Sequence, residues 1–341
     1  MNCVRYYLCL CILMNHFNIL TQACIPALPR IFGGVGSFFA ISGFLMFASY
    51  EKHHNLKGYL VRRARRILPP YVFIVILAAL TLVTLSTLTL LEYFTSAGFW
   101  KYLVCNLCFM NFMAPSLPGV FDGPENVINA VNGALWTMKG EVVCYLMVPV
   151  LFNVIRRFPR RCTLILAACL AACFSVFLWF TFSGRFPEGS LHIVAKQFRV
   201  FSFFLCGALI NVHLKAFLRY KWVVLAVVLA MMGAAEINSS LYHILRPFSD
   251  SMLVIWCSLV GTWGVFASHR DSLSYDIYLF HFPIIQALVA TGMIAALGSI
   301  AGLVLTVGLT VGLAIISWNF IDAPILNAGK KKRSAKTIAP A

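Results

Sequence analysis

Long apolar stretches alternate with short polar or basic segments along most of the chain. One stretch, residues 72–91, contains no charged side chain. A helix that crosses a bilayer needs about 20 consecutive apolar residues. The pattern therefore predicts an all-α polytopic membrane protein, with about ten transmembrane helices around a polar cavity. The expected spans are 6–23, 32–50, 67–91, 134–155, 163–183, 196–213, 221–236, 251–268, 274–292 and 298–319.

Composition supports this fold class. Hydrophobic residues make up 61% of the 341 residues and charged residues 11%, whereas charged residues form about 25% of an ordinary soluble protein. Little sequence remains for a soluble domain. We expect one transmembrane domain over 1–325, followed by a basic, disordered cytoplasmic tail over 326–341 with affinity for anionic lipid.

The net charge of +16 could indicate a nucleic-acid partner, but the distribution of the charge argues against one. When the expected spans alternate from a cytoplasmic N-terminus, most of the 27 Lys and Arg residues fall on the inner side. Cytoplasmic loops of membrane proteins carry this excess of positive charge. The pattern predicts a multi-pass protein of the inner (plasma) membrane with both termini cytoplasmic, in contact with the lipid bilayer and not with nucleic acid.

The segment RRARRILPPY at 62–71 precedes the apolar stretch of the third expected span. Basic residues at such a position are ordinary topology anchors. However, Pro69 and Pro70 suit the first turn of a helix, which would place Arg63 and Arg66 one turn apart. Four arginines without a lysine also favour forked recognition of phosphate. The segment is an anchor and, in addition, a candidate anion site.

Ionisable side chains inside expected spans are costly and indicate function. His16 follows Arg5 by eleven residues, so the two lie within about 20° of one helix face and about 16 Å apart along its axis. An anion held at Arg5 and a proton acceptor at His16 would line one path. A lone histidine in an apolar helix can also serve as a structural hydrogen-bonding residue.

Two further polar foci lie in later spans. Glu141 is near Lys139, which could neutralise it, and Tyr145 at i+4 shares its face, so an internal ion pair explains it as well as catalysis does. Tyr278 and His281 stand at i and i+3 in SYDIYLFHFP, where His281 could equally be a packing residue. Three foci predict a water-accessible cavity. Its candidate lining residues are Ser42, Tyr71, Lys139, Tyr145, Tyr278 and His281.

Small residues and cysteines suggest packing more than chemistry. The segment 33–46, GGVGSFFAISGFLM, places small residues where helices or a ligand approach closely, and helix packing alone is the favoured interpretation. Most of the 12 cysteines lie in apolar segments, where they act as small hydrophobic residues. Cys105 and Cys108 form a lone CxxC with no second pair at metal-ligand spacing, so no metal site is predicted.

The longest expected outer loop spans residues 92–133. Its first part, FWKYLVCNLCFMNF at 99–112, is amphiphilic and should lie at the membrane interface or dip into the membrane. Residues 115–133 are rich in Pro, Gly and Asn and should form a loop without regular structure.

Six segments of the chain occur in the same order as the motifs of one protein family. They are Arg5-x10-His16, VGSFFAISGFL at 35–45, RRARRILPPY at 62–71 with Arg63-x-x-Arg66, LWTMKGEVVCYLMVP at 135–149, FRVFSFFLCGALI at 198–210 and SYDIYLFHFPI at 274–284. Over nearly its full length the chain resembles acyltransferase family 3, integral membrane proteins of the type that O-acetylates bacterial surface polysaccharides. Asp322-Ala323-Pro324 departs from the frequent Glu-x-Pro of that family.

The resemblance implies an acetyl-CoA-dependent O-acetyltransferase. Acetyl-CoA, or a related acyl-CoA, would be used on the cytoplasmic side, and the acyl group would reach a glycan or lipid-linked glycan acceptor at or beyond the outer leaflet. Arg63 and Arg66 would contact the CoA phosphates, and Arg5 would help to position the donor. His16 would be the essential base or the acyl carrier, and Glu141 matches the acidic position of a family motif.

Acyl transfer to a hydroxyl needs a base that takes the alcohol proton, and His16 can supply it either by direct attack of the alcohol or through a transient acyl-histidine. Two other classes remain open. A transporter or flippase for a lipid-linked sugar or small anion would use the same polar foci as a path, although inverted repeats and broken helices are not visible in the sequence. A non-catalytic scaffold would tolerate changes at Arg63, Arg66 and His16.

Overall fold

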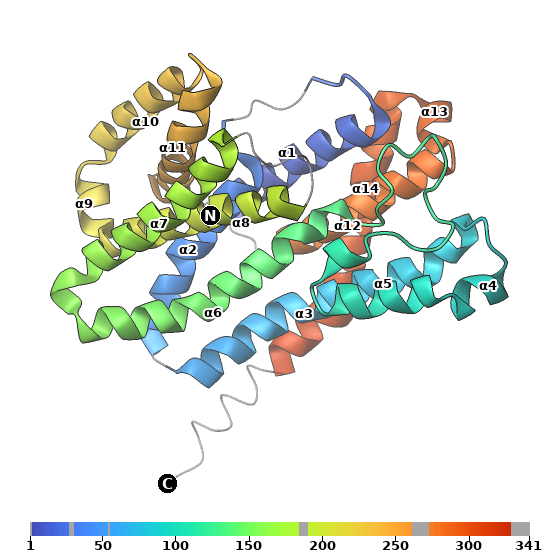
Figure 1. The fold of residues 1–341 in the computed structure, drawn as a ribbon, viewed down its shortest axis with the longest axis horizontal. Helices are drawn as coiled ribbons and strands as arrows, with labels where there is room; N and C mark the ends of the chain where they lie inside the picture. The colour runs from blue at the N-terminus through green and yellow to red at the C-terminus, as the bar shows by residue number, and fades with distance from the viewer. Residues whose placement is uncertain (1, 27–30, 54, 184–189, 261–272, 329–341) are drawn as a thin grey trace, which may run out of the picture. The chain divides into compact units, whose positions relative to one another are not determined.

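The computed structural model describes residues 2–26, 31–53, 55–183, 190–260 and 273–328. Within these ranges every regular element is a helix (Figure 1). The all-α prediction is therefore confirmed for the described chain. Most of the predicted basic tail lies outside it.

Six helical segments among the described residues are long and apolar enough to cross a membrane, by length and composition. They define a multi-pass membrane protein. The expected number of about ten spans stays a prediction, since other apolar helices, such as the 15-residue Lys221–Ala235, fall short of this criterion. The six segments are Asn2–Thr21, Leu56–Leu85, Gly133–Arg157, Pro159–Phe182, Leu273–Ala290 and Ser299–Ala328.

The chain forms two compact units. The first unit comprises Met1–Leu8, Pro29–Tyr59 and Thr137–Ser268, and the second comprises Cys9–Leu28, Leu60–Trp136 and His269–Ala341. The main helices of the first unit are α2 (Gly34–His53), α6 (Trp136–Arg157), α7 (Cys162–Phe182), α8 (Ser190–Val212), α9 (Leu214–Arg219), α10 (Lys221–Ala235) and α11 (Ser239–Val260). Those of the second are most of α1 (Asn2–Thr21) and α3 (Leu56–Thr81), then α4 (Leu90–Thr95), α5 (Ala97–Leu107), α12 (Leu273–Ala290), α13 (Met293–Leu297) and α14 (Ser299–Ser317).

Within the first unit, α2 and α8 pack backbone against backbone. A Cβ atom on Gly43 would lie 1.9 Å from the carbonyl oxygen of Phe204, and one on Gly207 would lie 2.0 Å from that of Ala40. No side chain fits at either glycine. The prediction that small residues of segment 33–46 serve close helix packing is confirmed at this contact.

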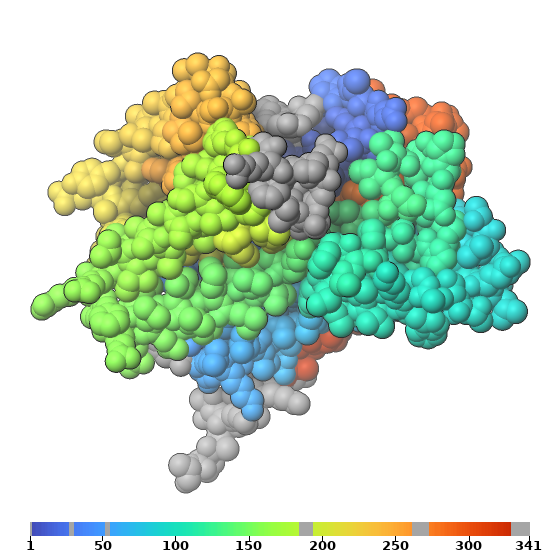
Figure 2. Space-filling view, in the orientation of Figure 1, coloured from blue at the N-terminus to red at the C-terminus, as the bar shows by residue number. Residues whose placement is uncertain are grey.

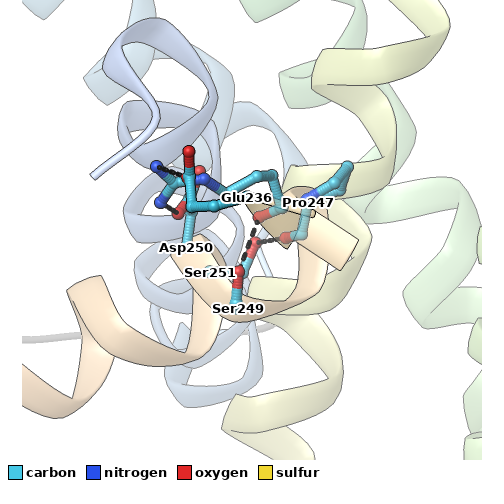
Figure 3. Close-up of polar contacts among 6 residues, drawn as sticks. Glu236, Pro247, Ser249, Asp250 and Ser251 are labelled. Carbon is cyan, nitrogen blue, oxygen red and sulfur yellow. Dashed lines mark hydrogen bonds and ion pairs between the residues drawn. The ribbon is translucent and has the colours of Figure 1, made fainter. Parts of the chain in front are cut away.

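Helix α11 begins at Ser239, well before the predicted start at residue 251. That prediction was wrong because a hydropathy pattern registers apolar residues only, and this part of the helix is held by polar contacts. Arg246 Nη1 donates to Asp250 Oδ1 at 3.0 Å, and Nη2 lies 3.4 Å from Glu236 Oε1 (Figure 3). Arg246 is 7% exposed and Asp250 1% exposed, so this ion pair is buried.

The same carboxylate lies at the beginning of α2. A Cβ atom on Gly33, the residue before the helix, would lie 2.2 Å from Asp250 Oδ2. The first turn of α2 has no acidic residue of its own, and negative charge near a helix N-terminus is stabilising. Asp250 on α11 therefore supplies this charge to α2 from a distant part of the sequence.

Helix α3 runs from Leu56 to Thr81 through Pro69 and Pro70. The prediction that the two prolines occupy its first turn was wrong, because the basic segment before them is already helical. A proline removes the hydrogen bond to the carbonyl four residues earlier, here those of Arg65 and Arg66. Membrane helices tolerate such positions where neighbouring groups compensate.

The segment 92–133 divides as predicted. Helices α4 and α5 occupy its first part, and Thr89 and Glu92 form a capping box at the beginning of α4. Residues 114–132 contain neither helix nor strand. The loop prediction for 115–133 is therefore confirmed up to the short 3-10 turn Gly133–Leu135.

Candidate histidine site

Helices α1 and α12 lie side by side in the second unit and run in the same direction. The Cys9 thiol donates to the carbonyl oxygen of Ser274 at 2.8 Å, and His16 Nδ1 lies 2.7 Å from His281 Nε2. Both contacts join residues that are 265 positions apart, so the register is constant along the two helices. His16 and His281, predicted in separate foci, are thus direct partners.

The hydrogen bonds of this pair determine which nitrogen atoms carry protons. His281 Nδ1 lies 3.2 Å from the carbonyl oxygen of Ile277, which can only accept, so Nδ1 carries the proton. In the neutral ring, Nε2 of His281 then accepts, and His16 Nδ1 donates to it. The lone pair of His16 is left on Nε2, where it can act as a base or nucleophile.

The surroundings fix the orientation of the His16 ring. The two imidazole rings are nearly parallel, with an interplanar angle of 10° and centroids 5.0 Å apart. The ring of Phe282 contacts His16 edge-on, with centroids 5.2 Å apart. His281 is 1% exposed, whereas His16 is partly exposed. His16 is therefore the accessible member of the pair and His281 its buried support.

Helix α12 also contacts α3 beside the proposed phosphate-binding arginines. The Tyr275 hydroxyl donates to the carbonyl oxygen of Ile67 at 3.4 Å, next to Arg66. Arg63 and Arg66 lie one turn apart on the continuous helix α3, as predicted, and both are partly exposed. From Tyr275 to His281 the axial distance along α12 is about 9 Å. One helix thus connects the arginine-bearing turn with the histidine pair.

Two buried carboxyl groups lie near Arg66. Asp276 on α12 and Asp322 interact with each other and with Arg66. Ser317 Oγ donates to Asp322 Oδ2 at 3.3 Å. Hydropathy and spacing did not identify this cluster as a site, although the isolated acidic residues in apolar surroundings were a visible signal.

Other predicted site residues belong to the first unit. Tyr145 donates to Glu141 Oε1, which confirms that the two share a face of α6. Lys139 is partly exposed on the same helix, and Ser42 is buried in α2. The first residues of α1, including Arg5, are also counted with this unit. The functions predicted for these residues stay predictions.

The two tyrosines expected to line the cavity in the second unit bind backbone carbonyls. Tyr278 donates to Ala134 at 3.1 Å. Tyr71 is 1% exposed, donates to Asn106, and stacks on Phe109 with ring centroids 4.5 Å apart. Both hydroxyls thus anchor neighbouring segments.

Among the described residues, no group of three or more His, Cys, Asp or Glu side chains could hold a metal ion. Cys105 and Cys108 are free thiols, and Cys108 is exposed.

Comparison with known proteins identifies the class. A family model described as an acyltransferase domain matches residues 1–319, and the chain belongs to this family. With its membrane-spanning helices, it is a multi-pass membrane acyltransferase. The resemblance stated from the six motifs is thereby confirmed.

Two relatives cover most of the chain. It is 25% identical over 318 residues to nodulation protein 10 of Rhizobium leguminosarum bv. viciae, covering 86% of this chain and 82% of the relative. It is 24% identical over 313 residues to an O-acetyl transferase of Shigella phage Sf6, covering 87% of this chain and 85% of that protein. No solved structure matches.

Proposed function

We propose that this acyltransferase moves an acetyl or related acyl group from cytoplasmic acyl-CoA to a hydroxyl of a cell-surface glycan or glycan precursor. The observation that carries the proposal is the pair of His16 and His281, which leaves a lone pair on Nε2 of His16. The similarity to an O-acetyl transferase supports oxygen as the acceptor atom.

In the direct reaction, the oxygen of the acceptor hydroxyl attacks the thioester carbonyl carbon while His16 Nε2 takes the proton of that hydroxyl. The carbon–sulfur bond then breaks, and the CoA thiolate takes the proton from the imidazolium. Throughout this step His16 Nδ1 still donates to His281 Nε2. This hydrogen bond stabilises the positive charge on His16 and holds its ring in place.

The alternative is a covalent path. His16 Nε2 attacks the thioester carbonyl carbon, the carbon–sulfur bond breaks, and CoA leaves as the thiolate. The acceptor hydroxyl then attacks the acyl-imidazolium, the bond to Nε2 breaks, and the hydroxyl proton ends on the CoA thiolate. The same tautomer serves both paths, because each needs the lone pair on Nε2. A labelled acyl-enzyme trapped without acceptor would distinguish them.

Arg63 and Arg66 are the proposed contacts for the CoA phosphates, since two guanidinium groups one turn apart suit bidentate binding of phosphate. Arg5 is the proposed third contact. This places the donor at the cytoplasmic end of α3 in a plasma-membrane protein with both termini cytoplasmic, in keeping with the basic inner loops.

His16→Ala tests the proposal. Purified protein in nanodiscs receives acetyl-CoA labelled in the acetyl group, and membranes from cells that lack the protein supply the acceptor. We expect transfer to fall at least about a hundredfold, the scale of general-base catalysis. His213→Ala is the matched control, because His213 is an exposed histidine of the first unit bonded to Thr163. Retained transfer in a folded His16→Ala protein would refute the role of His16.

Absence of transfer by the wild-type protein, together with movement of a lipid-linked sugar across the membrane, would favour a transporter instead. Mass spectra of glycans from deletion and wild-type cells identify the acceptor and the acyl group. The expected difference is the loss of an acetyl increment.

A further inference from the structure

The segment 126–134, which contains three asparagines and is called the strap below, is hydrogen-bonded to α12 on the C-terminal side of His281. Gln286 Nε2 donates to the carbonyl oxygens of Ile128 at 2.6 Å and Ala130 at 2.9 Å. Asn126 Nδ2 donates to Gln286 Oε1 at 3.0 Å. Gln286 is 0% exposed, so its side-chain amide has no access to water. Both of its N–H groups and its oxygen form hydrogen bonds with the strap instead.

The strap follows α12 towards the histidines. Asn132 Nδ2 donates to the carbonyl oxygen of Leu279 at 2.8 Å, and the Tyr278 hydroxyl donates to that of Ala134 at 3.1 Å. Later strap residues thus contact earlier residues of α12. The strap therefore runs antiparallel to the helix and passes the turn that carries His281.

The strap reaches His16 through one aromatic ring. A Cβ atom on Gly133 would lie 2.6 Å from the ring of Phe282. The same ring contacts both histidines edge-on, with centroids 5.2 Å from His16 and 6.5 Å from His281. Phe282 is 2% exposed, so its ring is closely packed by its neighbours. The position of the strap backbone therefore determines the position of Phe282 against His16.

The strap lies on the side of the histidine pair opposite the arginine-bearing turn. Gln286 is about 16 Å along α12 from Tyr275, which contacts α3 beside Arg66. Val127 is 48% exposed and Asn129 is also exposed. The part of the chain that contains the strap belongs to the green-cyan surface in Figure 2. The strap thus lies partly at the surface, away from the arginine-bearing turn of α3 where the CoA phosphates are proposed to bind.

We propose that Gln286 is a positioning residue for acyl transfer: it holds the strap as the acceptor-side wall and, through Phe282, orients His16. The inference rests on the proposed role of His16. Gln286 bonds to the strap and lies about 16 Å along α12 from the contact with α3 beside Arg66. Its loss should therefore lower kcat and leave the KM for acyl-CoA unchanged.

Two variants detach the strap from opposite sides. Gln286→Leu removes the three contacts of the Gln286 side chain. Asn126→Ala removes both contacts that Asn126 makes, to the side-chain oxygen and to the backbone carbonyl oxygen of Gln286. Thr306→Val is the matched control, since it removes a buried hydroxyl of α14 that donates to Gly302 of the same helix at 2.8 Å. Size-exclusion chromatography of each full-length protein in detergent verifies folding, and Asn126→Ala keeps the test available if Gln286→Leu does not fold.

The assay uses labelled acetyl-CoA and membranes of cells lacking the protein. We expect kcat to fall about tenfold to a hundredfold in Gln286→Leu, the range for a misplacement of about 1 Å, and less in Asn126→Ala. The KM for acetyl-CoA should stay within about twofold of wild type, and amide exchange should increase in residues 126–134. The inference would be overturned if Gln286→Leu had the same kcat as Thr306→Val. It would also be overturned if the KM of Gln286→Leu for acetyl-CoA rose by as large a factor as its kcat fell. His16→Ala is assayed alongside. If it loses transfer while Gln286→Leu does not, only the role of Gln286 fails; if it keeps transfer, the proposed function itself fails.

Discussion

Replacing His281 with phenylalanine removes the atom that accepts the Nδ1 proton of His16, while a ring of similar shape remains. The hydrogen bond between these rings becomes charge-assisted when His16 is protonated in the transition state. Such bonds contribute about 1.5–3 kcal/mol. At about 1.36 kcal/mol per tenfold change in rate, kcat should fall about 10- to 150-fold.

A second variant makes the prediction specific. His281→Gln places an amide oxygen near the position of Nε2, so it keeps an acceptor for His16. We expect its kcat to lie between those of wild type and His281→Phe. Steady-state transfer from labelled acetyl-CoA measures all three proteins. The KM for acetyl-CoA should change little, because His281 lies about 9 Å along α12 from Tyr275, which contacts α3 beside Arg66. Equal activity of His281→Phe and wild type, with both folded, would refute the tautomer assignment.

Two further predictions concern the stability of the first unit. Gly43→Ala should destabilise the protein by about 1–3 kcal/mol, because its Cβ would lie 1.9 Å from the Phe204 carbonyl oxygen; the control Gly233→Ala, with nothing within 4 Å, should be neutral or stabilising. Asp250→Ala should cost about 3–5 kcal/mol, because it leaves the buried Arg246 without its closest carboxylate. Thermal unfolding in detergent measures both. A similar Tm for Gly43→Ala and Gly233→Ala would contradict the first prediction, and a change in Tm for Asp250→Ala no larger than that of surface variants would contradict the second.

Local features of the sequence predicted much of the fold. Apolar stretches of bilayer length predicted the helices, because no other local arrangement satisfies the backbone polar groups in lipid. Spacing predicted that Glu141 and Tyr145 share a face and that Arg63 and Arg66 lie one turn apart. These are consequences of helix geometry within a few residues.

Helix ends were predicted less well where polar residues form the helix. The beginning of α11 depends on the buried pair of Arg246 and Asp250, and Asp250 also lies at the beginning of α2. Hydropathy treats such a segment as a loop. Only the position of α2 relative to α11 makes burial of this charge favourable, and no local pattern contains that information.

The sequence by itself determined the class of protein, its helices and the motifs that relate it to acyltransferases. The tertiary structure alone decided that His16 meets His281 across 265 residues and that Gln286 holds the strap. A histidine or glutamine in an apolar helix reveals that a polar partner is needed, because an unsatisfied polar group in lipid is costly. Which partner satisfies it depends on the register between packed helices, and that register is the sum of contacts between residues far apart in the chain.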